Sequence, residues 1–165
     1  PPTEDFFMGT AAVRVLLPAM QLTLPEVVDI SMPAEGVFHN LVIVSIKKEY
    51  PGHPRKVMHG LWGMGLLMLS KTIIVVDQYV NVQDPSEVAW RVANNIDPVR
   101  DVMFAEGPID DLDHATLIPR YGSKRGIDAT AKGLADGMTR SWPDDIVMSD
   151  EIKRLVDSKW DQYGI

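Results

Sequence analysis

The chain has 165 residues and a mass of 18.4 kDa, which is enough for one domain with its own hydrophobic core. Apolar residues make up 45% and charged residues 24%, a balance typical of globular proteins and not of disordered or fibrous ones. The absence of cysteine excludes disulfide frameworks, thiolate metal sites and cysteine nucleophiles, and it fits a reducing cytoplasm. The net charge of -7 argues against nucleic acid or an anionic membrane as a partner.

The N-terminal region predicts a short helix and no membrane span. Apolar side chains recur at helical spacing from about Gly9 to Met20, and Pro18 and Pro25 distort or end this helix. The longest apolar stretch, residues 61–69, is shorter than the roughly 20 residues that a bilayer requires. The chain opens on Pro1-Pro2, without Met or a signal sequence, so we expect a chain entered partway.

A strand, a helix and a second strand are predicted next. Val27–Met32 begins a strand-like region, and the β-branched run Val37–Ile46 is typical of a strand buried on both faces. A helix starts at His53-Pro54, since proline is favoured at the first helical position, and residues 72–76 form another β-branched run. One face of the helix is predicted to carry Val57, Leu61, Met64 and Met68.

The C-terminal half begins with a clear helix start. Asp84-Pro85-Ser86-Glu87 supplies an acidic N-cap, proline at the first position and glutamate at the third. A short strand is predicted at Val102–Ala105, followed by a long irregular region at 107–147, which suggests a binding surface, a lid or a chain contact. Ser149 is predicted to cap a final helix with an apolar stripe at Ile152, Leu155, Val156, Trp160 and Tyr163.

These elements predict an α/β fold with a small mixed or parallel sheet flanked by helices. We divide the chain into an α/β domain at residues 1–147, which includes the irregular region, and a C-terminal helix at 148–165.

The candidate metal ligands and acids have competing interpretations. His53 and His59 lie on different faces of one helix and His39 in an apolar strand, so no metal-ligand spacing emerges. The carboxylates at 110–113, followed by His114, form a cation site, an acid–base pair or simply a solvated turn.

Three glycines and a basic segment each have two possible roles, one in ligand binding and one in structure. Gly60, Gly63 and Gly65 lie within helical periodicity, which favours close packing over a phosphate-binding loop. The segment 120–126 holds three cations between glycines and either binds an anion or pairs with carboxylates. Ser123 lacks the frame of a nucleophile elbow.

Several sequence segments resemble those of the UbiD family of decarboxylases. They match in order and spacing and cover nearly the whole chain. They are Pro25-Glu26-Val27-Val28-Asp29, Glu35-Gly36-Val37-Phe38-His39-Asn40, residues 47–53, residues 56–63, Thr72-Ile73-Ile74-Val75-Val76-Asp77, residues 80–84, residues 97–101, Leu112-Asp113-His114-Ala115 and residues 122–130.

The resemblance implies decarboxylation of aromatic or α,β-unsaturated acids, including polyprenyl hydroxybenzoates of quinone biosynthesis, with prenylated FMN, manganese and potassium. In that family the modified flavin carries the difficult step and a glutamic acid supplies the replacing proton. The family's catalytic arginine and glutamate and its metal ligands match no segment here. We therefore transfer no catalytic and no metal-binding residue, and we expect this chain alone to hold no cofactor and to be inactive.

The resemblance does imply four site residues and a set of partners. Leu117 resembles the leucine that covers the substrate, Ile118 follows it, and Leu69 falls where another pocket residue lies. Lys71 is the candidate for contact with the cofactor phosphate. The implied partners are the N-terminal flavin-binding part of the same enzyme and further copies of the chain, with the C-terminal helix in subunit contacts.

Two other functions stay open. One is a stand-alone assembly or regulatory module that binds a partner through residues 107–147 and the helix containing Trp160. The other is a small independent enzyme that uses Asp113 and His114 as base and acid.

Overall fold

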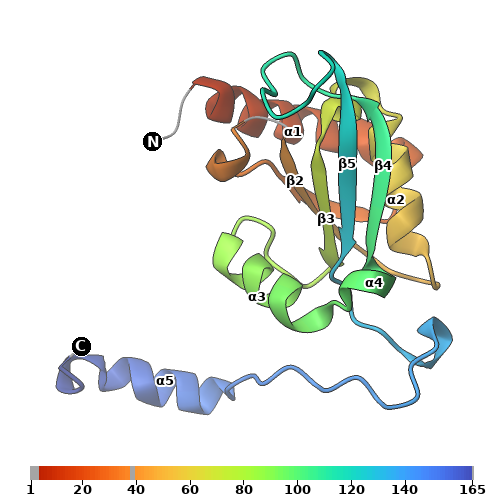
Figure 1. The fold of residues 1–165 in the computed structure, drawn as a ribbon. Coiled ribbons are helices and arrows are strands. Elements are labelled where there is room, and N and C mark those ends of the chain that lie inside the picture. Colours follow the sequence, from red (N-terminus) through yellow and green to blue (C-terminus); the bar gives the residue numbers. More distant parts are fainter. Residues whose placement is uncertain (1–3, 38–39, 165) are drawn as a thin grey trace.

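The computed structural model describes residues 4–37 and 40–164 of the chain (Figure 1). The α/β fold class expected from the sequence is confirmed, because helices and strands alternate along most of the chain. In chain order the elements are α1 (Glu4–Thr23), β1 (Val27–Ser31), the 3-10 turn η1 (Ala34–Gly36), β2 (Leu41–Ile46), α2 (His53–Trp62), η2 (Gly65–Leu69), β3 (Thr72–Asp77), α3 (Pro85–Asn95), α4 (Pro98–Asp101), β4 (Val102–Pro108), β5 (Tyr121–Asp128), η3 (Leu134–Asp136), α5 (Asp150–Ser158) and η4 (Trp160–Gln162).

The five strands form one mixed sheet in the order β1-β2-β3-β5-β4. The three central strands are parallel, with Ile74 of β3 beside Ile43 of β2 and Ile127 of β5. The two outer strands, β1 and β4, run antiparallel to their neighbours. The amino ends of β3 and β5 therefore lie at one edge of the sheet, where the loop 109–120 between β4 and β5 also lies (Figure 1).

Helices cover both faces of the sheet, and each face has its own core. The larger core lies between the sheet and α1, α2 and η2. Its fully buried side chains include Ile30, Val42, Val44, Ile46, Val57, Met58, Leu61, Ile73 and Val75. The smaller core lies between the opposite face and α3, with Ile43, Val76, Val80, Val82, Val88 and Ala129. Alternate residues of one strand thus enter different cores, as strand geometry requires.

The helix that starts at His53 is shorter than predicted. It ends at Trp62, and Met64 and Met68 lie in the following segments instead of on its face. The physical reason is the glycine pair: Gly63 caps the helix, and Gly65 has a φ of +47°, a left-handed backbone conformation that cannot continue the helix. The predicted strand at 37–46 begins only at Leu41; the part at 38–39, including His39, lies outside the described residues.

The irregular region predicted at 107–147 contains a strand, so that prediction is wrong for residues 121–128. Strand β5 lies between β3 and β4, within the sheet. The sequence pattern does not predict this strand, because its inward positions include Lys124 and Gly126. A buried strand normally carries large apolar residues at such positions.

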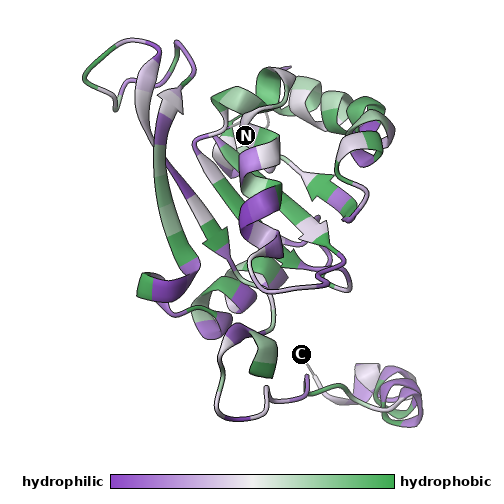
Figure 2. Cartoon of the chain, turned by 90° about the vertical axis from the view of Figure 1, so that its right-hand side faces the viewer, coloured by the Kyte–Doolittle hydropathy of each residue, from purple (hydrophilic) through white to green (hydrophobic). Residues whose placement is uncertain are grey.

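Helix α1 is longer and more apolar than predicted. The window Phe6–Thr23 is long and apolar enough to cross a membrane by length and composition alone, with a mean hydropathy of 1.3, and Figure 2 shows this helix largely in apolar colours. Only 17% of the window is buried. The apolar run was not recognised in the sequence because Arg14 and Pro18 interrupt it. A single helix of this kind is weak evidence for a membrane span, so no clear span is found among the described residues. Arg14 nevertheless forms an ion pair with Asp29 of β1 at 2.7 Å, which joins α1 to the sheet.

The C-terminal helix α5 lies apart from the sheet, at the end of an extended segment (Figure 1). The predicted cap is confirmed, since the Ser149 hydroxyl accepts a hydrogen bond from the N–H of Ile152 at 3.3 Å. Its apolar side chains are about half exposed, among them Ile152 at 42% and Leu155 at 46%.

Candidate functional site

The residues predicted to touch substrate and cofactor lie at the edge of the sheet where β3 and β5 begin. Leu69 ends η2 and is half-buried, and Lys71 lies one residue before β3. Leu117 and Ile118 lie on the loop 109–120, which leads into β5. Topology therefore brings to one edge residues that are more than 45 positions apart in the chain.

An ion pair joins this loop to the start of β3. The Lys71 Nζ lies 2.7 Å from a carboxylate oxygen of Asp113, whose side chain is only 4% exposed. The other carboxylate oxygen accepts a hydrogen bond from the N–H of Ala115 at 2.9 Å. The hydrogen bond from Lys71 holds the pKa of Asp113 below its ordinary value, so this carboxylate is ionised at neutral pH.

The loop presents apolar side chains to its surroundings. Leu117 is fully exposed, at 102% of its reference area, and Leu112 and Ile118 are exposed at 78% and 58%. Each exposed leucine leaves apolar surface area in water. Covering that area with a second surface is favourable by roughly 25 cal/mol of free energy per Å² buried. A loop held in place at its base and apolar at its tip is suited to covering a surface.

A buried lysine lies beneath this edge and was not anticipated from the sequence. Lys124 of β5 is 3% exposed, and its Nζ donates hydrogen bonds to the carbonyls of Met68 and Ser70, the latter at 3.2 Å. The indole N–H of Trp62 donates to the same Ser70 carbonyl at 3.0 Å. Burial lowers the pKa of Lys124 to about 8. The lysine thus fixes the turn that carries Leu69 into the strand.

An apolar cavity of about 250 Å³ lies on the other side of η2, between this turn and α1. It is lined by Ala12, Val13, Leu16, Ala19, Met20, Thr23, Met32, Met64, Gly65, Leu66 and Leu67. Such a lining offers no charged group to orient a substrate.

Contacts within the chain account for Arg120 and Arg125 of the basic segment and for Gly60, while an added Cβ at Gly65 would meet nothing within 4 Å. Arg120 pairs with Asp111 at 2.5 Å, and Arg125 donates to the hydroxyl of Thr72 at 3.2 Å. The pairing interpretation therefore holds for Arg120. Packing also explains Gly60, where an added Cβ would lie 2.9 Å from the side chain of Leu24.

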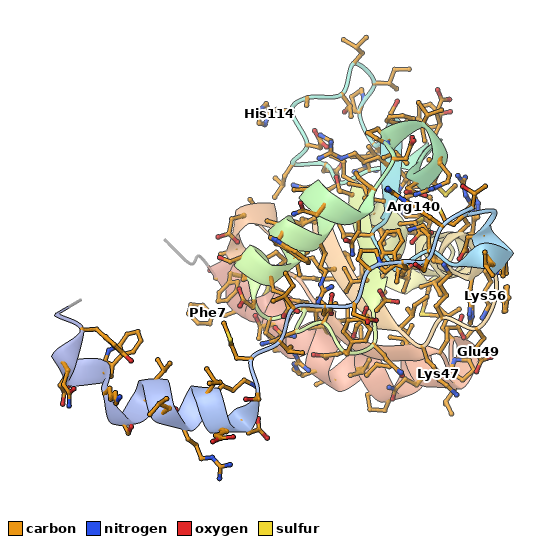
Figure 3. All side chains as sticks on the ribbon, turned by 90° about the horizontal axis from the view of Figure 1, so that it is seen from below. Phe7, Lys47, Glu49, Lys56, His114 and Arg140 are labelled. Atoms are coloured by element: carbon orange, nitrogen blue, oxygen red, sulfur yellow. The ribbon has the colours of Figure 1, made fainter. Side chains whose placement is uncertain are left out.

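The three histidines among the described residues lie in structural or exposed positions. His53 is buried; its Nδ1 accepts the N–H of Glu49 at 3.2 Å, and its Nε2 lies 3.3 Å from the carboxylate of Glu26. His114 points away from the molecule at the edge of the loop (Figure 3), while the neighbouring Asp113 turns inward to Lys71. Within residues 4–37 and 40–164, no group of three His, Asp or Glu side chains is placed to hold a metal ion.

The opposite edge of the sheet carries a polar network. Asp77 ends β3 and accepts the N–H of Ala131 at 2.7 Å, and burial raises its pKa. Lys132 is 3% exposed and lies 3.2 Å from the carboxylate of Asp128, while Lys48 pairs with Asp136 at 2.8 Å. These contacts fold the segment after β5 back under the sheet. The charged groups of the network pair with one another, and the network holds the segment after β5 against the sheet.

Residues 6–129 match the family model described as the 3-octaprenyl-4-hydroxybenzoate carboxy-lyase C-terminal domain. A protein of Aquifex aeolicus without an assigned function is 53% identical over 165 residues, which are 100% of this chain and 34% of that protein. The chain therefore spans about a third of the length of the curated relatives it matches.

Solved structures share the fold. The closed form of the vanillic acid decarboxylase of Sedimentibacter hydroxybenzoicus is 26% identical with a TM-score of 0.75, over 87% of this chain and 30% of that one. The UbiD-class enzyme HmfF of Pelotomaculum thermopropionicum, in complex with FMN, is 25% identical with a TM-score of 0.73, over 90% of this chain and 33% of that one.

Proposed function

This chain belongs to the family of 3-octaprenyl-4-hydroxybenzoate carboxy-lyases, the UbiD decarboxylases, through their C-terminal domain, and we propose that it forms one wall of a decarboxylase substrate pocket. The observation that supports this role is the fully exposed Leu117 on a loop tied to the sheet by the Lys71–Asp113 ion pair. The substrate class is an aromatic or α,β-unsaturated carboxylic acid, in agreement with the vanillic acid decarboxylase that shares the fold. A polyprenyl hydroxybenzoate of quinone biosynthesis is one member of this class.

The proposed role of this chain is to close the pocket. Leu117, Ile118 and Leu69 supply an apolar cover that packs on the substrate and excludes water. Excluding water strengthens the electrostatic interactions around a carboxylate as it loses carbon dioxide. The groups that carry the chemistry belong to the flavin-binding part of the enzyme, which is the proposed partner of this surface.

The proposed cofactor is prenylated FMN, which supplies the electron sink for decarboxylation when bound. Lys71 fits a contact with its phosphate, because the side chain is 34% exposed and an ammonium group has three donors. The manganese and potassium ions of the family find no ligand group among the described residues. We propose that these ions bind in the flavin-binding part of the enzyme.

The helix α5 is proposed to hold subunits together in a cytoplasmic homo-oligomer. Its partly exposed apolar residues include Ile152 and Leu155, and the helix lies apart from the domain that precedes it (Figure 1). Helices with one apolar stripe are stabilised mainly by packing that stripe on a partner. Light scattering after size exclusion tests this role, and a monomer at high concentration would contradict it.

The pocket-closing role is tested by Leu117→Arg in the complete enzyme. We expect kcat/KM for an aromatic acid to fall by about tenfold or more, because a cation replaces the apolar cover. The matched control is Leu112→Arg, which makes the same change on the same exposed loop and is expected to alter kcat/KM less than about twofold. Unchanged kinetics in Leu117→Arg would remove this residue from the pocket, provided that circular dichroism shows an intact fold.

A stand-alone assembly or regulatory module is the second candidate, and the exposed apolar face of α5 is the observation that favours it. The mass of the native protein separates the two functions. A mass near three times 18.4 kDa supports a domain of a complete decarboxylase, since the relatives are about three times as long as this chain. A mass near 18.4 kDa supports a separate module and directs the search to its partner.

A further inference from the structure

The loop 109–120 has a defined shape although its tip is exposed. At its base Ile109 is 1% exposed, and its N–H donates to the carbonyl of Arg120 at 3.2 Å. Near its centre the Thr116 hydroxyl donates to the carbonyl of Asp113 at 3.2 Å. The side chain of Thr116 packs on Gly122 of β5 so closely that an added Cβ there would lie 2.5 Å from it. The residue that follows Thr116 is the fully exposed Leu117.

A long-range ion pair adds to these local contacts and joins the middle of the loop to the sheet. Lys71 approaches Asp113 from the start of β3, 42 positions earlier in the chain, at 2.7 Å. The backbone of Lys71 is itself fixed, because its carbonyl accepts the N–H of Arg125 on β5 at 2.9 Å. The lysine therefore holds the loop from a rigid point of the sheet.

Burial makes this pair stronger than an ordinary surface pair. The Asp113 side chain is 4% exposed and that of Lys71 34%. The pair between Arg120 and Asp111, on the same loop, is 77% and 59% exposed and is screened by solvent. Loss of the lysine would leave a buried carboxylate with no cation beside it, and the loop would have to open to hydrate it.

We propose that Lys71 and Asp113 are a positioning pair that fixes the loop 109–120 on the sheet, so that Leu117 and Ile118 keep one orientation toward the substrate. The inference rests on the proposed function for its catalytic consequence. The fixation of the loop itself depends only on the contacts described above. Lys71 then acts on the substrate through the loop and not through the cofactor phosphate.

Hydrogen exchange of the loop amides in the complete enzyme tests the fixation. Lys71→Met breaks the pair from the sheet side and leaves the loop's own hydrogen bonds unchanged. We expect exchange at residues 112–118 to become at least about tenfold faster. The charge reversal Lys71→Glu with Asp113→Lys is expected to restore most of the protection. Asp111→Asn, which breaks the exposed pair on the same loop, is the matched control and should leave the exchange within about twofold.

The kinetics of the same variants separate positioning from phosphate contact. A positioning pair predicts that Lys71→Met raises KM for the substrate several-fold more than it lowers kcat, and that the charge reversal restores KM. Unchanged exchange in Lys71→Met would overturn the proposal. A KM that stays raised in the reversal, despite restored protection, would also overturn it and assign Lys71 to the phosphate. The result for Leu117→Arg decides the proposed function separately.

Discussion

Arg91 of α3 donates two hydrogen bonds to Asp145, at 2.7 and 2.8 Å, and ties the extended C-terminal segment to the domain. The guanidinium also lies over two aromatic rings, 4.9 Å from the centre of Trp90 and 5.3 Å from that of Tyr79. Planar two-bond pairing with stacking is a geometry that arginine provides and lysine does not. The direction in which the chain leaves toward α5 is therefore set at Asp145.

Asp145→Asn is expected to release this segment. The amide loses the charge that Arg91 pairs with, so limited proteolysis should cut between residues 140 and 149 several-fold faster than in the parent protein. The hydrogen bonds from Arg91 lower the pKa of Asp145, so the pair is complete above the ordinary carboxyl pKa and is lost only as the pH falls through the lowered pKa. Asp144→Asn is the control, since it changes the adjacent carboxylate; equal cleavage of the two variants would contradict the anchoring role.

The N-cap of α3 gives a prediction about stability. The Asp84 carboxylate accepts hydrogen bonds from the N–H groups of Ser86 and Glu87 at 2.9 and 3.3 Å. Asp84→Ala is expected to lower the free energy of unfolding by about 1 kcal/mol, measured by urea denaturation. Asp84→Ser keeps a hydrogen-bond acceptor, so its free energy of unfolding should fall by only a few tenths of a kcal/mol. An unchanged free energy of unfolding in Asp84→Ala would mean that α3 is stabilised by packing alone.

Elements with regular apolar patterns were predictable from the sequence. The β-branched runs of β2 and β3 and the cap at Asp84 follow local rules that the structure obeys. Strand β5 was not predictable in this way, because its core-facing positions carry Lys124 and Gly126. Gly126 leaves room for Met58, whose sulfur would lie 2.4 Å from an added Cβ, so the helix supplies the apolar volume that the strand lacks.

The candidate site was predictable only in part for a similar reason. Lys71 and Asp113 are 42 positions apart, and no local pattern indicates that they meet. The sequence also suggested Asp113 and His114 as an acid–base pair, but the carboxylate turns to Lys71 while His114 points outward. Neighbouring positions on a loop point in different directions, so adjacency in sequence was a poor guide to chemistry here.

Gly36→Ala is expected to destabilise the domain by about 1 to 3 kcal/mol. An added Cβ would lie 2.6 Å from the Cβ and 2.8 Å from the backbone nitrogen of Leu41, and backbone at the start of β2 cannot move aside as a flexible side chain can. Gly133→Ala is the matched control, because an added Cβ there has no described atom within 4 Å and its φ of -119° suits alanine. Urea denaturation of both variants measures the difference. Equal stability would show that Leu41 shifts without cost.

Lys124→Met tests the buried lysine through the pH dependence of stability. The pKa of Lys124 is lowered to about 8 from 10.5 by burial, so between these values the unfolded chain holds a proton that the folded chain has released. The free energy of unfolding of the parent protein, relative to Lys124→Met, should therefore rise between pH 8 and 10.5, by about 1 to 3 kcal/mol. Other groups titrate in both proteins and cancel in the difference. A difference that stays constant across this range would show that the ammonium is as well solvated by the Met68 and Ser70 carbonyls as it is by water.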